Sequence, residues 1–154
     1  MEVLPVLIGA VLLWPVGLMI GRFINRVLTC DHVEAPSGIQ ADDWRAAVQG
    51  PGPGAAYIGR LESLLVYLAV LFARGDAALV VAGWFAFKVA SKWELWSNVV
   101  KMPDSFDGAT QLDSLRARRK LGYVMYDRFL VGTLLNILAG AIVAGFVLRY
   151  THAG

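Results

Sequence analysis

The stretch Phe129–Leu148, FLVGTLLNILAGAIVAGFVL, decides the fold because it contains no Asp, Glu, Lys, Arg or His. A second stretch of this kind is Val3–Gly21. At a rise of about 1.5 Å per residue, either stretch is long enough as a helix to cross the ~30 Å hydrocarbon layer of a bilayer. The 154-residue chain is 57% apolar and 17% charged, whereas ordinary soluble domains carry about 25% charged residues. The sequence therefore predicts an all-α integral membrane protein.

The first apolar stretch is expected to be a retained helix rather than a cleaved signal peptide. Glu2 precedes it, and Arg22 and Arg26 follow it. This order is the reverse of a signal peptide, in which positive charge comes before the apolar region. Pro15 lies near the middle of the helix and is expected to kink it, because proline lacks the backbone N–H that an interior helical residue donates.

Two shorter apolar runs, residues 64–73 and 77–87, flank the sequence Arg74-Gly75-Asp76. Each becomes long enough to span a membrane if its helix continues past the run, and the two helices then form a hairpin. We therefore expect a four-helix bundle in a single membrane domain, residues 1–154. The expected spans are residues 3–27, 57–73, 77–96 and 124–149, with loops at 28–56 and 97–123 and a tight outer turn at 74–76.

The positive charges are concentrated on one side of this bundle. Of the 14 Lys and Arg residues, 12 lie in or beside the two long loops, and only Arg74 and Arg149 lie on the other side. Because cytoplasmic loops of membrane proteins carry the excess of Lys and Arg, both long loops are expected in the cytoplasm and both termini outside. An alternative with two spans, in which residues 61–96 fold as a cytoplasmic hairpin, would also keep most positive charges inside.

Short interfacial helices are expected within the cytoplasmic loops. Ser37-Gly38-Ile39-Gln40 fits the capping-box pattern S-x-x-Q and predicts a helix over residues 38–49. The run Gly50-Pro51-Gly52-Pro53-Gly54 should end this helix and act as a linker into the second span. In the other loop, helix is expected from about Gln111.

Basic residues at the inner boundary are expected to contact lipid headgroups. Each such residue near an anionic leaflet contributes about 1 kcal/mol of membrane binding. A more specific partner for this cluster is a second possibility, but the net charge of only +2 argues against nucleic acid. The predicted lipid-contacting residues are Arg60, Lys92, Arg116, Arg118, Arg119 and Lys120.

Polar residues inside the expected spans should form one layer. Glu62 and Lys88 are equally far along the chain from Gly75, so both lie about 20 Å from the outer surface. Asn136 is separated from Arg149 by the same number of positions, which gives it the same depth, with Thr133 close by. An unpaired charge in hydrocarbon is costly, so we predict a buried layer of Glu62, Lys88, Asn136 and Thr133.

Two roles are open for this layer. It could fix the register of the helices, or it could form a proton, ion or small-substrate site, since intramembrane ionisable residues often mark such pathways. A different arrangement is also open, in which Lys88 extends toward the inner interface and Glu62 pairs with Arg60 or is protonated.

Small residues are expected to let the helices approach closely. Gly17 and Gly21 form a G-x-x-x-G step in the first span. The last span has two comparable steps, Ala141 with Gly145 and Gly140 with Ala144. Such steps allow close packing within one chain or between copies.

Signals for catalysis, a metal or a cofactor are missing from the sequence. The chain has two histidines, His32 and His152, and one cysteine, Cys30, and the segment 30–34 matches no zinc-ligand spacing. G-x-S-x-G, Walker and H-E-x-x-H motifs do not occur. No catalytic residue, metal or cofactor is therefore predicted, and enzyme activity is not favoured.

Three short motifs give a resemblance. Ile58-Gly59-Arg60-Leu61-Glu62, then Lys88, then Gly132-Thr133-Leu134 resemble a pattern in uncharacterised bacterial inner-membrane proteins, with helices carrying I-G-x-L-E-R, A-A-K-S and G-T-L-x-S in that order. The resemblance covers about residues 55–148 and implies the same membrane. This chain differs in having Ser63 and Asn136 where the pattern has Arg and Ser.

The function that the sequence favours is association within the membrane. The chain would act as a homo-oligomer or as an accessory or structural subunit of a larger assembly, with membrane lipids and other membrane subunits as partners. Two alternatives stay open: a channel or transporter that uses the polar layer, and a membrane enzyme that modifies lipid headgroups.

Overall fold

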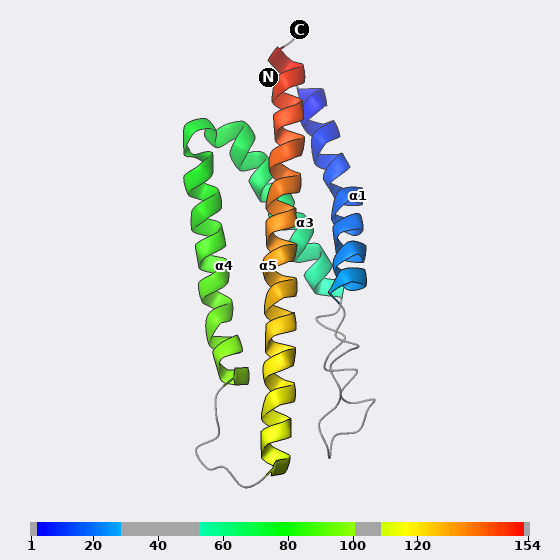
Figure 1. Cartoon of the computed structure of the whole chain (residues 1–154). Helices are drawn as coiled ribbons and strands as arrows, with labels where there is room; N and C mark the ends of the chain where they lie inside the picture. Colours follow the sequence, from blue (N-terminus) through cyan, green and yellow to red (C-terminus); the bar gives the residue numbers. More distant parts are fainter. Residues whose placement is uncertain (1–2, 29–52, 101–108, 153–154) are drawn as a thin grey trace.

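The computed structural model describes residues 3–28, 53–100 and 109–152, and nearly all of these residues are helical. The described chain has four α-helices and no strand, as predicted (Figure 1). Two of the helices are long and apolar enough to cross a membrane. The α-helices are α1 Val3–Val27, α3 Pro53–Leu68, α4 Ala77–Val100 and α5 Ala109–His152.

Helix α1 is continuous through Pro15. Of its 25 residues, only Gly9 and Leu13 are buried. Helix α1 therefore contacts its neighbours along one face and leaves most of its apolar surface exposed. A helix of this composition in the core of a soluble protein would instead be buried on most sides.

The α3–α4 hairpin turns without a loop. Helix α3 begins at Pro53, so Pro53 and Gly54 belong to its first turn and not to the linker that the sequence predicts there. Proline is favoured at this position because the first turn of a helix does not use its N–H groups for internal bonds. A π-helical segment, Ala69–Ala73, continues α3, and a 3₁₀ turn at Arg74–Asp76 leads into α4. The rest of the predicted linker and the helix over residues 38–49 lie outside the described residues.

The second long loop is shorter than predicted. The helix expected from about Gln111 is confirmed and begins at Ala109, but it is continuous with the last span as one helix of 44 residues, α5. Because α4 also continues to Val100, most of the predicted loop 97–123 is helical. The opening segment of α5, ATQLDSLRARRKL, contains neither Gly nor Pro and is rich in good helix formers. The sequence changes from polar to apolar near residue 124, but no proline lies at this boundary and the helix continues through it.

Helix α5 is the centre of the bundle. Figure 1 shows α4 along one side of α5 and α1 along the other, with α3 crossing α5 obliquely from the side of α1 to the side of α4. The two chain ends lie at the same end of the bundle. At the opposite end of α1, Arg128 on α5 donates to Asn25 at 2.6 Å; we call this end, which also holds Arg22 and Arg26, the basic end.

A small apolar core joins α1, α3 and α5 near the end that carries the termini. The Tyr67 side chain is fully buried in it, and its hydroxyl donates to the backbone carbonyl of Val6 on α1 at 2.8 Å. Gly9 leaves the space that the Tyr67 ring occupies. The buried members of this core are Leu13, Tyr67, Leu71, Ala144 and Val147.

The small residues of α5 divide into an inner and an outer set. A Cβ added at Gly140 would collide with the backbone carbonyl of Ser63, and Ala144 is fully buried. Gly145, in contrast, has no atom within 4 Å of an added Cβ, and Ala141 is half-buried. The Gly140–Ala144 step therefore forms the α3–α5 contact, while Gly145 faces outward.

In α1, the two glycines of the predicted step also differ. Gly17 lies against the side chain of Arg60, whereas Gly21 has no neighbour within 4 Å of an added Cβ. Within the described chain, only one glycine of the G-x-x-x-G step makes a close helix contact.

Gly140→Ala should destabilise the protein by about 1–3 kcal/mol, because the added methyl meets backbone that cannot rotate away. The matched control is Gly145→Ala, which should leave stability unchanged or raise it by up to ~1 kcal/mol through helix propensity. Thermal unfolding of the detergent-solubilised variants measures both effects. Equal Tm values for the two variants would contradict the close α3–α5 contact.

Candidate functional site

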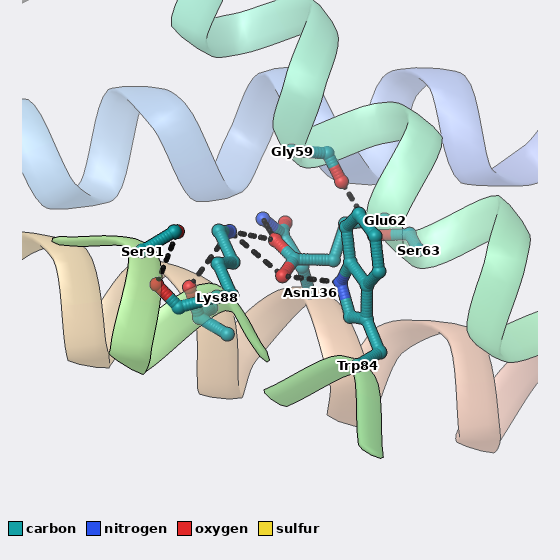
Figure 2. Close-up of polar contacts among 8 residues, drawn as sticks. Gly59, Glu62, Ser63, Trp84, Lys88, Ser91 and Asn136 are labelled. Carbon is teal, nitrogen blue, oxygen red and sulfur yellow. Dashed lines mark hydrogen bonds and ion pairs between the residues drawn. The ribbon is translucent and has the colours of Figure 1, made fainter. Parts of the chain in front are cut away.

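A buried ion pair joins α3 and α4 (Figure 2). Lys88 Nζ lies 2.7 Å from both Oε1 and Oε2 of Glu62. The Glu62 side chain is 0% exposed and the Lys88 side chain 16%. Charge-assisted hydrogen bonds of this length are about twice as strong as those between neutral groups, so the pair fixes α4 against α3 although these two helices have few other contacts.

Two neutral donors complete the surroundings of the carboxylate. Trp84 Nε1 donates to Glu62 Oε1 at 3.2 Å, and Asn136 Nδ2 donates to Oε2 at 3.3 Å. Trp84 and Lys88 are four residues apart on α4 and therefore share one helix face. Each oxygen of Glu62 thus accepts one bond from Lys88 and one from a neutral side chain.

Helix α5 also supplies an acceptor for the ammonium group. Lys88 Nζ donates to Thr133 Oγ1 at 2.9 Å, and Thr133 and Asn136 are both buried. The three protons of Lys88 thus have three oxygen acceptors, which matches the hydrogen-bonding capacity of an ammonium group. We call Glu62, Trp84, Lys88, Thr133 and Asn136 the polar cluster.

Gly59 on α3 makes room for one member of the polar cluster, Asn136. A Cβ at Gly59 would lie 2.7 Å from Asn136 Nδ2, so a larger residue there would push the amide away from Glu62. Ser63 Oγ donates to the carbonyl of Gly59 at 3.3 Å, and the carbonyl of Lys88 accepts from Ser91 Oγ at 2.9 Å (Figure 2). The Phe129 ring centroid lies 5.1 Å from Lys88 Nζ.

The structure brings together the four residues that the sequence places at one depth, Glu62, Lys88, Asn136 and Thr133. Trp84 and Gly59 were missed. The spacing of Trp84, about one helical turn before Lys88, could have indicated the first, but no sequence signal identifies which glycine meets an amide. The alternative pairing of Glu62 with Arg60 does not occur, since the Arg60 guanidinium lies over the rings of Trp14 and Tyr57.

The predicted lipid-contacting residues are spread over separate places. Arg60 is half-buried against α1, whereas Lys92, Arg119 and Lys120 are exposed. Arg116 forms an exposed pair with Asp113 at 3.4 Å, and the side chain of Arg118 is outside the described part. Arg60 on α3 and Lys92 on α4 thus lie on other helices than Arg116, Arg119 and Lys120, which are on α5.

Metal-binding clusters are absent from the described part of the chain. No group of three or more His, Cys, Asp or Glu side chains that could hold a metal ion occurs among the described residues. Cys30, His32 and the segment between them lie outside the described ranges.

Comparison with known proteins gives no relative. No family model matches the chain, and neither a curated protein nor a solved structure is significantly similar to it. The resemblance through the three helix motifs therefore stays a prediction, and support for a function comes from the chain's own geometry.

Lys88→Met should destabilise the protein by about 3–5 kcal/mol, because the carboxylate of Glu62 loses its charged partner and remains buried. The double variant Glu62→Gln/Lys88→Met should recover at least half of that loss, since it removes both charges. Thermal unfolding in detergent at neutral pH gives the comparison.

The control for this experiment is Arg116→Ala. It breaks a pair whose side chains are 66% and 65% exposed, and such pairs contribute little, so its stability should stay within about 0.5 kcal/mol of wild type. A Lys88→Met variant as stable as this control would show that the buried pair has no structural role.

Proposed function

We propose that this chain is an integral membrane protein of the bacterial inner membrane that acts by association with copies of itself or with other membrane subunits. The supporting observation is an inverted distribution of side chains. Large apolar residues are exposed on all four helices, for example Leu4, Leu79 and Phe146 at 67%, 75% and 65%, while Glu62 and its donors are inside. Hydrocarbon favours this arrangement and water opposes it.

The charge distribution supports an orientation. Arg22, Arg26 and Arg128 lie together at the basic end, and Arg149 lies near the end that carries both termini. Because the cytoplasmic ends of membrane helices carry the excess of Lys and Arg, the basic end faces the cytoplasm and both termini face outward.

Resistance to extraction tests the membrane proposal. The full chain, expressed in a bacterial host, should stay in the membrane pellet after washing with alkaline carbonate, because its apolar outer surface has no other solvent. A chain released into the supernatant as folded protein would contradict the proposal.

Two features support association over transport. First, the carboxylate oxygens of Glu62 and the ammonium of Lys88 are bonded within the chain, so the polar cluster already has a structural role. Second, α4 is packed mainly against α5 and the π-helical segment, which leaves one side of it outside. That side carries Leu79, Gly83, Ala86, Ala90 and Trp93, all exposed and spaced by three or four residues.

The small residues on this outer face of α4 suit contact with another helix. Gly83 has no atom within 4 Å of an added Cβ, and alanines follow three and seven residues later. Because Gly83 has no side chain and the alanines have only a methyl group, a second helix can come close to the backbone of α4 here. Close van der Waals contact of this kind is a main attraction between helices in lipid.

Cysteine cross-linking in membranes tests the association. On a Cys30→Ser background, Gly83→Cys should give a disulfide-linked dimer if the partner is a second copy, or a larger adduct if it is another subunit. The control is Leu138→Cys on α5. Gly83 and Leu138 are each five residues from the Lys88–Thr133 contact, in the same direction along the bundle, and both are exposed.

The result expected is adduct formation at Gly83 and none at Leu138, with mild oxidant and intact membranes. Absence of any adduct at Gly83, or equal adducts at both sites, would argue against association through α4. Uptake of ions into vesicles that hold the monomeric protein would instead favour the transport alternative.

A further inference from the structure

Arg60 has an unusual setting on the outer side of the α1–α3 contact. Its guanidinium carbon lies 4.3 Å from the ring centroid of Trp14 and 5.1 Å from that of Tyr57. The two rings meet edge to face, 6.2 Å apart. A Cβ at Gly17 would lie 2.8 Å from Arg60 Cγ, so the glycine allows the arginine stem to lie directly on α1.

The Nε of the Arg60 guanidinium lacks an acceptor among the described residues. Arg60 Nε is buried and has no hydrogen-bond partner within the described chain. The one acid of α3, Glu62, is engaged by the rest of the polar cluster. A buried donor without an acceptor is costly and is satisfied in nearly all native proteins, so an acceptor for Arg60 has to come from outside the described residues.

The surroundings of Arg60 favour an anion. Between Val3 and Val27, α1 carries Arg22 and Arg26 and no acidic residue. Asp127 is exposed on α5 at the same end of the bundle and is preceded and followed by no other acid within ten residues. Among the described residues at the basic end, Arg22, Arg26 and Arg128 outnumber Asp127, and such an excess of positive charge favours an anion near Arg60.

The depth of Arg60 suits a lipid headgroup. Gly17, which contacts Arg60, is five residues from Arg22, about 8 Å along the helix axis. The Arg60 guanidinium lies over both Tyr57, one turn nearer the start of α3 and the basic end, and Trp14, about one turn of α1 farther from that end than Gly17. Long basic side chains at this depth can reach an interface while their stems stay in apolar surroundings. Trp14 and Tyr57 are each more than half exposed, so the site opens to the outside of the bundle.

We propose that Arg60, with Trp14 and Tyr57, binds the phosphate of a phospholipid from the leaflet at the basic end. The planar guanidinium offers parallel N–H groups that match two phosphate oxygens, and the aromatic rings pack against the glycerol and the first carbons of the acyl chains. The proposal rests on the membrane placement proposed above.

Lipid retention measured by native mass spectrometry tests this site. The full-length protein is purified in detergent, stripped of lipid and titrated with phosphatidylglycerol. Wild type should bind one lipid in preference to further copies. Arg60→Gln should bind it at least tenfold more weakly, and Arg60→Lys at least threefold more weakly, because an ammonium keeps the charge but loses the paired donors.

The matched control is Arg26→Gln, which removes an exposed arginine from the same end of the bundle and should change binding less than twofold. If thermal unfolding shows that Arg60→Gln is not folded, the lipid titration is made with Arg60→Lys and Trp14→Leu instead, and both should bind the lipid more weakly than wild type. Equal lipid binding by wild type and both Arg60 variants would overturn the site.

Competition distinguishes the source of the phosphate. Inorganic phosphate at millimolar concentration should not displace the lipid, since it lacks the acyl chains; full displacement would overturn the lipid assignment and indicate a free-anion site. Carbonate extraction of the same variants separates this proposal from the previous one. A variant that stays in the membrane but no longer binds the lipid would support the Arg60 site, and a variant that leaves the membrane would count against the membrane proposal.

Discussion

A carboxylate in the interior of an apolar bundle is the constraint on which the rest of this structure depends. Glu62 is fully buried, and a lone buried charge is far too costly to persist. The chain meets this requirement with donors from two other helices, Lys88 and Trp84 on α4 and Asn136 on α5. Helix α4 packs mainly on α5 and the π-helical segment and has few other contacts with α3, so the polar cluster is what joins α4 to α3.

The other half of the bundle is held together by different means. Helix α1 joins α3 and α5 through glycine contacts and the bond from Tyr67 to Val6, with no ion pair among the described residues of that core. Small residues give close approach, and close approach gives many weak dispersion contacts. The bundle thus combines a polar joint on the α4 side with dry packing on the α1 side.

Counting residues from the turn predicts the level of the polar residues along the bundle, but it does not predict which neighbouring helix each side chain faces. Equal separations from the turn place Glu62 and Lys88 at one level, and they do pair. Arg60 is only two residues from Glu62, yet two residues turn a helix by about 200°, so Arg60 faces α1 and not the cluster. Which side of α3 meets which neighbour depends on tertiary packing. For the same reason Gly59 and Trp84 were missed. A helix from about Gln111 is expected from the sequence, but a span boundary drawn from hydropathy separates it from the last span, with which it is continuous in α5.

The unbroken course of α5 has a mechanical consequence. Its 44 residues make a rod of about 66 Å, roughly twice the thickness of a bilayer core. Arg116 near one end and Asn136 within the bundle lie on the same rigid element, with no loop or proline between them. A tilt or rotation of the turns near Arg116 would therefore also move Thr133 and Asn136, the α5 side chains of the polar cluster.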